Sequence, residues 1–400
     1  MDISFVGFGE KFDPVPAEVT TRLVDIGRAA GSADLWRDQF PKLLEALRQR
    51  AQVDSVTSSS AIEGVVAPAA RAQVMVEDAQ AQPRNRSEAE LRGYSNALTY
   101  AFTEAANEAH LSLGVILHLH RLLFEPAGLA GAGQFKTADN LVVDRLPDGS
   151  RQVRFTPVPA SETPQAVRDL VGACNDAIAR GRDTPLVPIA AAVLDFTIIH
   201  PFADGNGRIS RLLLNLLLSQ AGYDVGRYVS LERLIEQSKV RYYDSLLRST
   251  RGWEDRSHDV WPAVGYLIEI IDQAYRRFAR FAEVERAAGS KRGRVRTYLE
   301  GRGQQSFSIA EIRRASPGVS EATIRLVLHE LRDEGRIAGG SGRSARWQWL
   351  TSDAPADDRP ADEPISGRRG PAQRTLPRGR GRRAPGADES TGSVPDRLPE

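Results

Sequence analysis

The chain has 400 residues, of which 41% are hydrophobic, and its formal net charge is +1. This length allows two or three domains with sizeable cores, and the near-neutral charge excludes a general attraction to nucleic acids or anionic membranes. The only cysteine, Cys174, excludes an internal disulfide. We expect a cytoplasmic protein without membrane contact, because the first residues do not resemble a signal peptide and no apolar run reaches membrane-spanning length.

Helical spacing of apolar side chains dominates the first third of the chain. It predicts helices at about 16–30, 34–54, 68–80, 87–109 and 111–124. Between the second and third of these, the Ser-rich segment 55–64 predicts a short helix that ends at Glu63 and Gly64. His118 and His120 are two residues apart on a helix and therefore face different sides, which favours core packing over a shared metal.

The pattern changes between residues 126 and 159. Gly128, Gly131 and Gly133 end the helical spacing. The stretch LVVDRLPDGSRQVRF at 141–155 then predicts two short strands around a Pro-Asp-Gly turn, either as a solvent hairpin or as a functional one. Helices resume at 162–180, where Cys174 is expected in the core, and at 186–200.

The most informative segment is His200-Pro-Phe-Ala-Asp-Gly-Asn-Gly-Arg-Ile-Ser-Arg211, which lies between two strongly apolar runs. This arrangement predicts a helix, a tight polar loop and a second helix at 207–221. The beginning of a helix favours a phosphate, because its free N–H groups and the helix dipole point there. Gly205 and Gly207 let the backbone amides approach such an anion closely.

The polar side chains of this loop suit the same chemistry. Arg208 and Arg211 can bind phosphate oxygens in a bidentate way. Asp204 offers the hard oxygen ligands that Mg²⁺ accepts beside a nucleotide. His200 can act as a base near neutral pH.

Two further helices are predicted at 231–249 and at about 258–288. The first carries Tyr242 and Tyr243, which either pack against other helices or line a ligand pocket. In the second, Trp261 and Pro262 suit a helix start.

A separate module is predicted at 291–350, where the order helix, helix, helix, hairpin suits a winged helix-turn-helix. Ser320 is the expected N-cap of its third helix. The buried stripe of that helix comprises Ile324, Val327, Leu328 and Leu331. The polar residues expected outside are Thr323, Arg325 and Arg332 on the third helix, and Arg336, Arg343 and Arg346 around the Gly-rich wing at 339–342. We expect the module either to bind DNA or to serve as a protein-docking or dimer module.

The last residues, 351–400, contain almost no large apolar side chains. Such a segment cannot bury enough surface to fold, so we expect a disordered tail. Its basic stretch, RGPAQRTLPRGRGRRAP, is either a nonspecific nucleic-acid contact or a solvated extension.

The segment from His200 to Arg211 resembles the Fic (filamentation-induced-by-cAMP) family, because it matches every position of the family signature HPFx(D/E)GNGRxxR. The resemblance implies a mainly α-helical fold with an N-terminal helical module at 1–110 and a Fic core at 111–288. It also makes the hairpin a flap that registers a target chain by strand pairing. Asp139 and Asn140 correspond in position to this flap, and the GQFK segment is similar to the family's G-x-[YF]-R, with Lys136 in place of Arg.

The resemblance implies transfer of AMP from ATP to a Ser, Thr or Tyr hydroxyl of a protein, with the chain itself among the candidate targets. In this scheme His200 takes the hydroxyl proton and Asp204 holds Mg²⁺ on the phosphates. The amides around Gly205, Asn206 and Gly207 cradle those phosphates and stabilise the developing charge.

The same resemblance assigns Arg208 to the β-phosphate and Arg211 to the γ-phosphate, and it places Tyr243 at the adenine pocket. Gly207 is not the Lys of the Doc-type variant, which phosphorylates its target, so AMP transfer is favoured over kinase chemistry. UTP or another nucleotide donor stays open.

The segment 56–64 resembles the family's inhibitory helix, (S/T)xxxE(G/N), with Ser59 and Glu63 supplying the match. The resemblance implies that Glu63 pairs with Arg211 and occupies the place of the γ-phosphate. ATP would then bind with its α-phosphate misaligned for attack. A carboxylate there could also position a water that removes AMP, and the sequence leaves this open.

A second class of function is a DNA-binding transcriptional regulator that uses the Fic fold as a nucleotide sensor. The intact His200 favours the enzyme, because binding alone needs no base. The resemblance further leads us to expect a homodimer.

Overall fold

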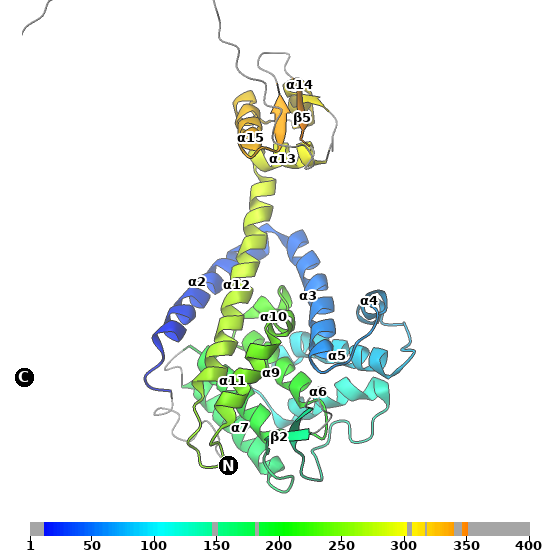
Figure 1. The fold of residues 1–400 in the computed structure, drawn as a ribbon, viewed down its shortest axis with the longest axis vertical. Coiled ribbons are helices and arrows are strands. Elements are labelled where there is room, and N and C mark those ends of the chain that lie inside the picture. Colours follow the sequence, from blue (N-terminus) through cyan, green and yellow to red (C-terminus); the bar gives the residue numbers. More distant parts are fainter. Residues whose placement is uncertain are drawn as a thin grey trace, which may run out of the picture. The chain divides into compact units, whose positions relative to one another are not determined.

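The computed structural model of the chain describes residues 12–145, 151–180, 184–301, 306–316, 318–339 and 346–350. The predicted tail, the turn of the 141–155 hairpin and Arg343 lie outside the described residues. Helices make up most of the described chain, as the sequence predicts, and two small antiparallel sheets accompany them (Figure 1).

The first helices are α2 (Ala17–Gln39), α3 (Pro41–Ile62), α4 (Ala69–Glu77), α5 (Arg86–Thr103) and α6 (Leu113–Phe124). The predicted break at 31–33 is wrong, since α2 runs on to Gln39 and packs along α12. The break falls at Phe40, because Pro41 opens α3 and disfavours helical geometry in the residue before it. Segment 55–62 is therefore the last part of α3 and not a separate helix.

The flap strands β1 (Val142–Arg145) and β2 (Arg151–Phe155) pair antiparallel, as predicted. The helices that follow are α7 (Thr163–Ala179), α8 (Leu186–Ile199), α9 (Asn206–Gln220), α10 (Leu231–Gln237), α11 (Lys239–Thr250) and α12 (Trp261–Gly289). The single helix predicted at 231–249 is divided in two at Ser238. The Ser238 hydroxyl donates to the Leu234 carbonyl at 2.9 Å and bonds the Tyr266 hydroxyl at 2.8 Å, which stabilises the break.

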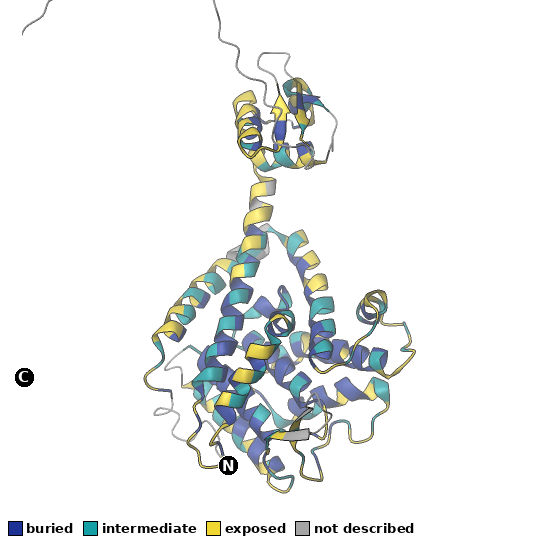
Figure 2. Ribbon diagram, viewed as in Figure 1, coloured by how far each residue is buried: buried dark blue, intermediate teal, exposed yellow. Residues whose placement is uncertain are grey.

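Helices α8 and α9 form the centre of the core. All residues of α8 except Thr197 are buried, and so are Arg208 to Leu218 of α9 (Figure 2). Such all-round burial explains why α8 is apolar on nearly every face, whereas α9 also buries the polar side chains of Arg208, Arg211 and Asn215. Phe202, in the loop between them, is fully buried. Within the described residues, none of the helices is both long and apolar enough to cross a membrane.

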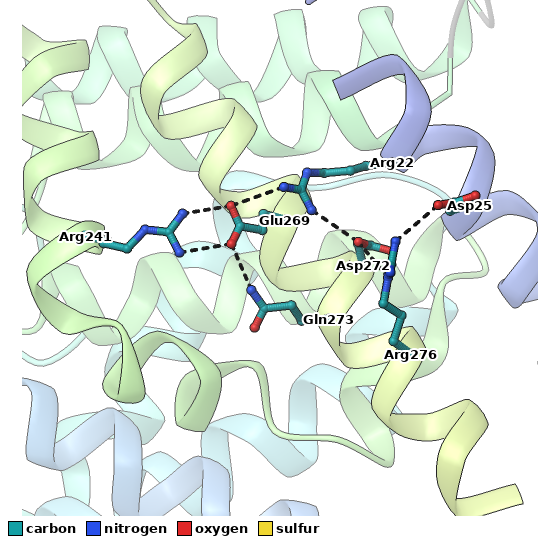
Figure 3. A network of polar contacts seen from close by, with 7 residues as sticks. All are labelled: Arg22, Asp25, Arg241, Glu269, Asp272, Gln273 and Arg276. Atoms are coloured by element: carbon teal, nitrogen blue, oxygen red, sulfur yellow. Dashed lines mark hydrogen bonds and ion pairs between the residues drawn. The ribbon is translucent and has the colours of Figure 1, made fainter. Parts of the chain in front are cut away.

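A chain of charged side chains fastens α2 to α11 and α12 (Figure 3). Arg241 of α11 makes a bidentate contact with Glu269 of α12, with distances of 3.0 and 2.8 Å. Arg22 of α2 lies 3.6 Å from Glu269 and donates to Asp272 at 3.3 Å. Three further members extend the network along α2 and α12: Asp25, Gln273 and Arg276. The network joins α2 to α11, the helix that carries Tyr242 and Tyr243.

The C-terminal module contains α13 (Lys291–Glu300), α14 (Ile309–Ala315), α15 (Glu321–Asp333) and a sheet of β3 (Phe307–Ser308), β5 (Arg346–Trp349) and β4 (Ile337–Gly339). The Ser320 side chain caps α15 by accepting from the Thr323 amide at 3.2 Å. The buried residues of α15 are the four predicted ones, Ile324, Val327, Leu328 and Leu331. The three helices and the final strand pair thus follow the predicted order, whereas β3 was not predicted, and the assignment as a winged helix stays a prediction.

Candidate active site

The loop between α8 and α9 begins and ends in left-handed backbone. His200 caps α8 with φ 51° and ψ 57°, and its amide donates to the Phe196 carbonyl at 3.0 Å. Gly205 precedes α9 with φ 82°. A Cβ atom at Gly205 would lie 2.6 Å from the Phe124 ring, so only glycine suits this close approach. The two caps place the imidazole and the free amides of α9 at opposite ends of one short loop.

Side chains inside the loop fix its backbone. Asn206 accepts from the Phe202 amide at 2.9 Å and donates back to the Phe202 carbonyl at 2.7 Å. The Phe202 ring stacks on the imidazole of His120 in α6, with centroids 3.8 Å apart. The loop is thus anchored by the ring of Phe202, which lies between His200 and Asp204 in the sequence.

His120 also holds the loop by hydrogen bonds. Its Nδ1 accepts from the Gly133 amide at 2.8 Å, so its proton is on Nε2, which donates to the Asp204 carbonyl at 3.2 Å. Burial lowers the pKa of His120 to about 4, which keeps the ring neutral. His118, in contrast, packs against Tyr100. The two histidines therefore face different surroundings, as their spacing predicts.

The beginning of α9 is occupied by a carboxylate from α3. A Cβ atom at Gly207 would lie only 2.3 Å from Glu63 Oε1 and 3.3 Å from Arg211 Nη1. The missing side chain therefore lets the carboxylate reach the position where a helix favours an anion. Glu63 itself is the C-cap of α3, so the end of one helix meets the start of another.

Arg211 is buried and held from the same helix. Its Nη2 donates to Glu63 Oε1 at 2.8 Å and to the Ser59 carbonyl at 3.0 Å, and its Nε donates to the Ser59 hydroxyl at 3.0 Å. Among the described residues, Nη1 has no hydrogen-bond partner. The two residues of the 56–64 motif thus contact one guanidinium of the 200–211 motif.

Arg208 is equally buried, and its partner is one that the sequence did not indicate. Its Nη1 donates to Glu90 of α5 at 2.6 Å, and its guanidinium lies 4.9 Å from the Phe124 ring centroid. Glu90 also accepts from Arg86 at 2.6 Å, and Arg86 lies 3.8 Å from Asp204. The pair Arg86 and Glu90 at i,i+4 on α5 was the only sequence signal for this cluster.

The Asp204 side chain is 60% exposed, and its Oδ1 accepts from the Gly205 amide at 2.6 Å. Its other oxygen, Oδ2, faces solvent and Arg86. In the described part of the chain, no three His, Cys, Asp or Glu side chains are grouped to bind a metal. One accessible carboxylate fits Mg²⁺ that takes its other ligands from phosphates and water.

The His200 imidazole is set up to accept a proton. Its Nδ1 lies 3.4 Å from the Thr197 carbonyl, which can only accept, so the proton is on Nδ1 and Nε2 carries the lone pair. Burial and the positive charge of Lys136 lower the pKa of His200 to about 4, while Glu63 and Asp204 oppose the shift. The imidazole is therefore neutral at physiological pH.

Tyr243 lies between the flap and the 56–64 motif, whereas Tyr242 is buried in the core. The Tyr243 ring has the Arg154 guanidinium of β2 at 5.0 Å and the Lys239 ammonium at 5.8 Å. Lys239 also donates to the Ile62 carbonyl at 2.6 Å. Burial raises the pKa of Tyr243 to about 12. The negative charge of Glu63 also raises this pKa, and the positive charge of Arg211 opposes the rise. The ten residues to which the resemblance assigns catalytic, ATP-binding, metal-binding or inhibitory roles thus belong to one region, and Glu90, Arg86, His120 and Lys239 lie beside them.

Residues 110–218 match the sequence model of the Fic/DOC family, and this part of the chain is a Fic domain. The chain is 27% identical over 251 residues to protein adenylyltransferase fic-1 of Caenorhabditis elegans. This alignment covers 60% of this chain and 45% of that protein. It is 28% identical over 181 residues to protein adenylyltransferase Fic of Nematostella vectensis, which covers 44% of this chain and 39% of that protein. The chain thus spans less than half the length of these curated relatives.

Two solved structures share the fold. A Fic family protein from Desulfovibrio desulfuricans G20 aligns with a TM-score of 0.55 at 19% identity, over 85% of this chain and 98% of that one. A Fic domain containing signaling protein from Bacteroides thetaiotaomicron VPI-5482 aligns with a TM-score of 0.53 at 21% identity, over 65% of this chain and 98% of that one.

Proposed function

We propose that this chain is a protein adenylyltransferase that transfers AMP from ATP to a Ser, Thr or Tyr hydroxyl of a protein. The observation that carries the proposal is the neutral, partly buried imidazole of His200 at one end of a loop whose other end is the beginning of α9. The similarity to curated protein adenylyltransferases supports the same reaction class.

In the proposed reaction, the hydroxyl oxygen of the target forms a bond to the α-phosphorus of ATP. The bond from that phosphorus to the bridging oxygen breaks, diphosphate leaves, and the hydroxyl proton moves to Nε2 of His200. The amides at the start of α9 and the buried guanidinium of Arg211 stabilise the phosphate charge. Arg208 stabilises the same phosphate charge, and Glu90 holds the Arg208 guanidinium in place. Asp204 would hold Mg²⁺, which neutralises phosphate charge when bound.

We further propose that Glu63 inhibits the transfer. Its carboxylate occupies the anion position above Gly207 and neutralises Arg211, so a γ-phosphate and Glu63 compete for one guanidinium. Tyr243 offers a half-buried aromatic face for the adenine ring beside the same carboxylate. The donor we propose is ATP, in line with the similarity to proteins named adenylyltransferases.

The test uses ATP labelled on the α-phosphate, Mg²⁺ and a cell lysate, with the Glu63→Gly variant. We expect label on protein hydroxyls and its loss, by about a thousandfold or more, in Glu63→Gly/His200→Ala. The same assay with γ-labelled ATP and with α-labelled UTP serves as the control. Transfer of the γ-label, preference for UTP, or label that persists without His200 would each overturn the assignment.

A further inference from the structure

Two polar side chains just before the flap reach into the loop that carries His200. The Lys136 amide donates to the Pro201 carbonyl at 2.9 Å, and Lys136 Nζ donates to the Ile199 carbonyl at 3.3 Å. Asn140 Nδ2 donates to the Phe202 carbonyl at 3.1 Å. The two are joined to each other, since Lys136 Nζ donates to Asn140 Oδ1 at 2.8 Å. We call this set of four hydrogen bonds the Lys136–Asn140 clamp.

The clamp holds the backbone on both sides of a strained residue. His200 has φ 51°, a left-handed conformation that is unfavourable for a residue with a Cβ. Such a conformation persists only where the surroundings fix it. The carbonyl of Ile199 lies at the end of α8, where helix carbonyls lack partners within the helix. The clamp supplies a donor to this carbonyl and to the two carbonyls that follow His200.

The ammonium of Lys136 acts inside the protein. Its side chain is only 5% exposed, and the bonds above direct its Nζ to a carbonyl and an amide oxygen. Burial lowers the pKa of Lys136 to about 8. A buried amine that already donates to two protein oxygens is suited to hold the backbone in place and not to contact a phosphate in solvent.

We propose that Lys136 and Asn140 are positioning residues, which orient His200 and fix the start of the flap relative to it. This inference rests on the proposed AMP transfer, in which His200 is the base. Only one residue separates Asn140 from β1, so the bonds that fix the carbonyls around His200 also fix the strand expected to register the target. A displacement of about 1 Å between base and hydroxyl can cost roughly a hundredfold in rate.

The kinetic test compares three variants in the Glu63→Gly background. Lys136→Met keeps the length of the side chain and removes its donors, and we expect kcat to fall about a hundredfold with the KM for ATP within about threefold. Lys136→Arg restores donors and should recover kcat to within about fivefold of the parent. Asn140→Asp keeps the acceptor for Lys136 but loses the donor to Phe202, and we expect a loss of about tenfold. A parallel rise in KM, or no rescue by Arg, contradicts a positioning role.

A second measurement does not depend on any reaction. Hydrogen exchange followed by mass spectrometry should show faster exchange in peptides that span 200–206 of Lys136→Met, by about tenfold or more, with α9 peptides unchanged. If Glu63→Gly transfers no AMP, the proposed function fails, and this exchange result still decides the clamp. If Lys136→Met does not fold, Asn140→Asp provides both readouts. An active parent whose variants keep its kcat and its loop exchange would overturn the inference.

Discussion

The Fic domain and the C-terminal module use arginine in opposite ways. In the Fic domain, Arg208 and Arg211 are 2% exposed and are held by Glu90 and Glu63, which are more than a hundred residues away in the chain. In the C-terminal module, Arg296 is a third exposed and pairs with Glu334 of the same small module. Three more such pairs are Arg325–Glu321, Arg336–Glu300 and Arg346–Glu311.

The difference indicates which arginines depend on their carboxylate partners for the stability of the fold. A buried guanidinium depends on its partner, because an uncompensated charge in the interior is strongly destabilising. An exposed pair contributes little, because water solvates both groups when they separate. The four arginines named above are already paired with carboxylates, and α15 carries three acidic residues against two arginines. This arrangement weakens the case for DNA contact through that helix, which the arginines by themselves suggested.

The largest expected effect is on the rate of AMP transfer. It compares Glu63, the partner of the buried Arg211, with Glu334, the partner of the more exposed Arg296. We expect Glu63→Gly to raise AMP transfer about a hundredfold over wild type, because ATP then gains the guanidinium of Arg211 in a productive position. Glu334→Gly, which releases Arg296, should leave the rate within about twofold. Initial rates with α-labelled ATP measure both, and equal rates of wild type and Glu63→Gly at several ATP concentrations would refute inhibition by Glu63.

The second comparison concerns stability. Glu90→Gln leaves the buried Arg208 with only the exposed carboxylate of Asp204, 3.7 Å away, as counter-charge, so we expect the free energy of unfolding to fall by about 3 kcal/mol. Glu334→Gln is the matched change at the surface and should cost less than about 1 kcal/mol. Urea unfolding followed by circular dichroism provides both values. Similar losses in the two variants would show that burial does not distinguish the pairs.

The third comparison uses pH. The pKa of His120 is about 4 in the folded chain, below its ordinary value of about 6.5, so the unfolded state binds more protons between these values. Stability is therefore full above about pH 6.5 and falls as the pH drops toward 4, by up to about 3 kcal/mol from this residue. His120→Asn should flatten that slope in urea unfolding at pH 4.5 to 7. A variant with the slope of wild type would assign the pH dependence to other groups.

The smallest expected effect is on DNA binding by the module. Because Arg325 is already paired with Glu321, we expect binding of a 30-bp duplex only in the nonspecific range, weaker than about 10 µM at physiological salt. Arg325→Ala should change that affinity by less than about threefold. Fluorescence anisotropy measures it, and nanomolar binding abolished by Arg325→Ala would restore the regulator hypothesis.

Much of the fold followed from local patterns. The apolar runs predicted α8 and α9, the glycines predicted the loop between them, and the capping serine predicted the start of α15. The break at Phe40 was missed although Pro41 is a local signal for it, because the prediction followed only the apolar spacing of residues 34–54. The division at Ser238 was missed because it depends on a hydroxyl contact with Tyr266, on which helical periodicity carries no information.

For the candidate site, the sequence by itself determined which chemical groups stand together between His200 and Arg211, because its pattern predicted a tight loop that leads directly into a helix and so keeps these groups close. It also indicated, through the family resemblance, that Glu63 belongs with Arg211. Only the tertiary structure decided what faces these groups from elsewhere: Glu90 against Arg208, His120 beneath the loop, and Lys136 with Asn140 around His200. Such contacts join segments separated by some sixty to more than a hundred residues, and a local pattern of spacing cannot specify which distant donor reaches a buried carbonyl or carboxylate.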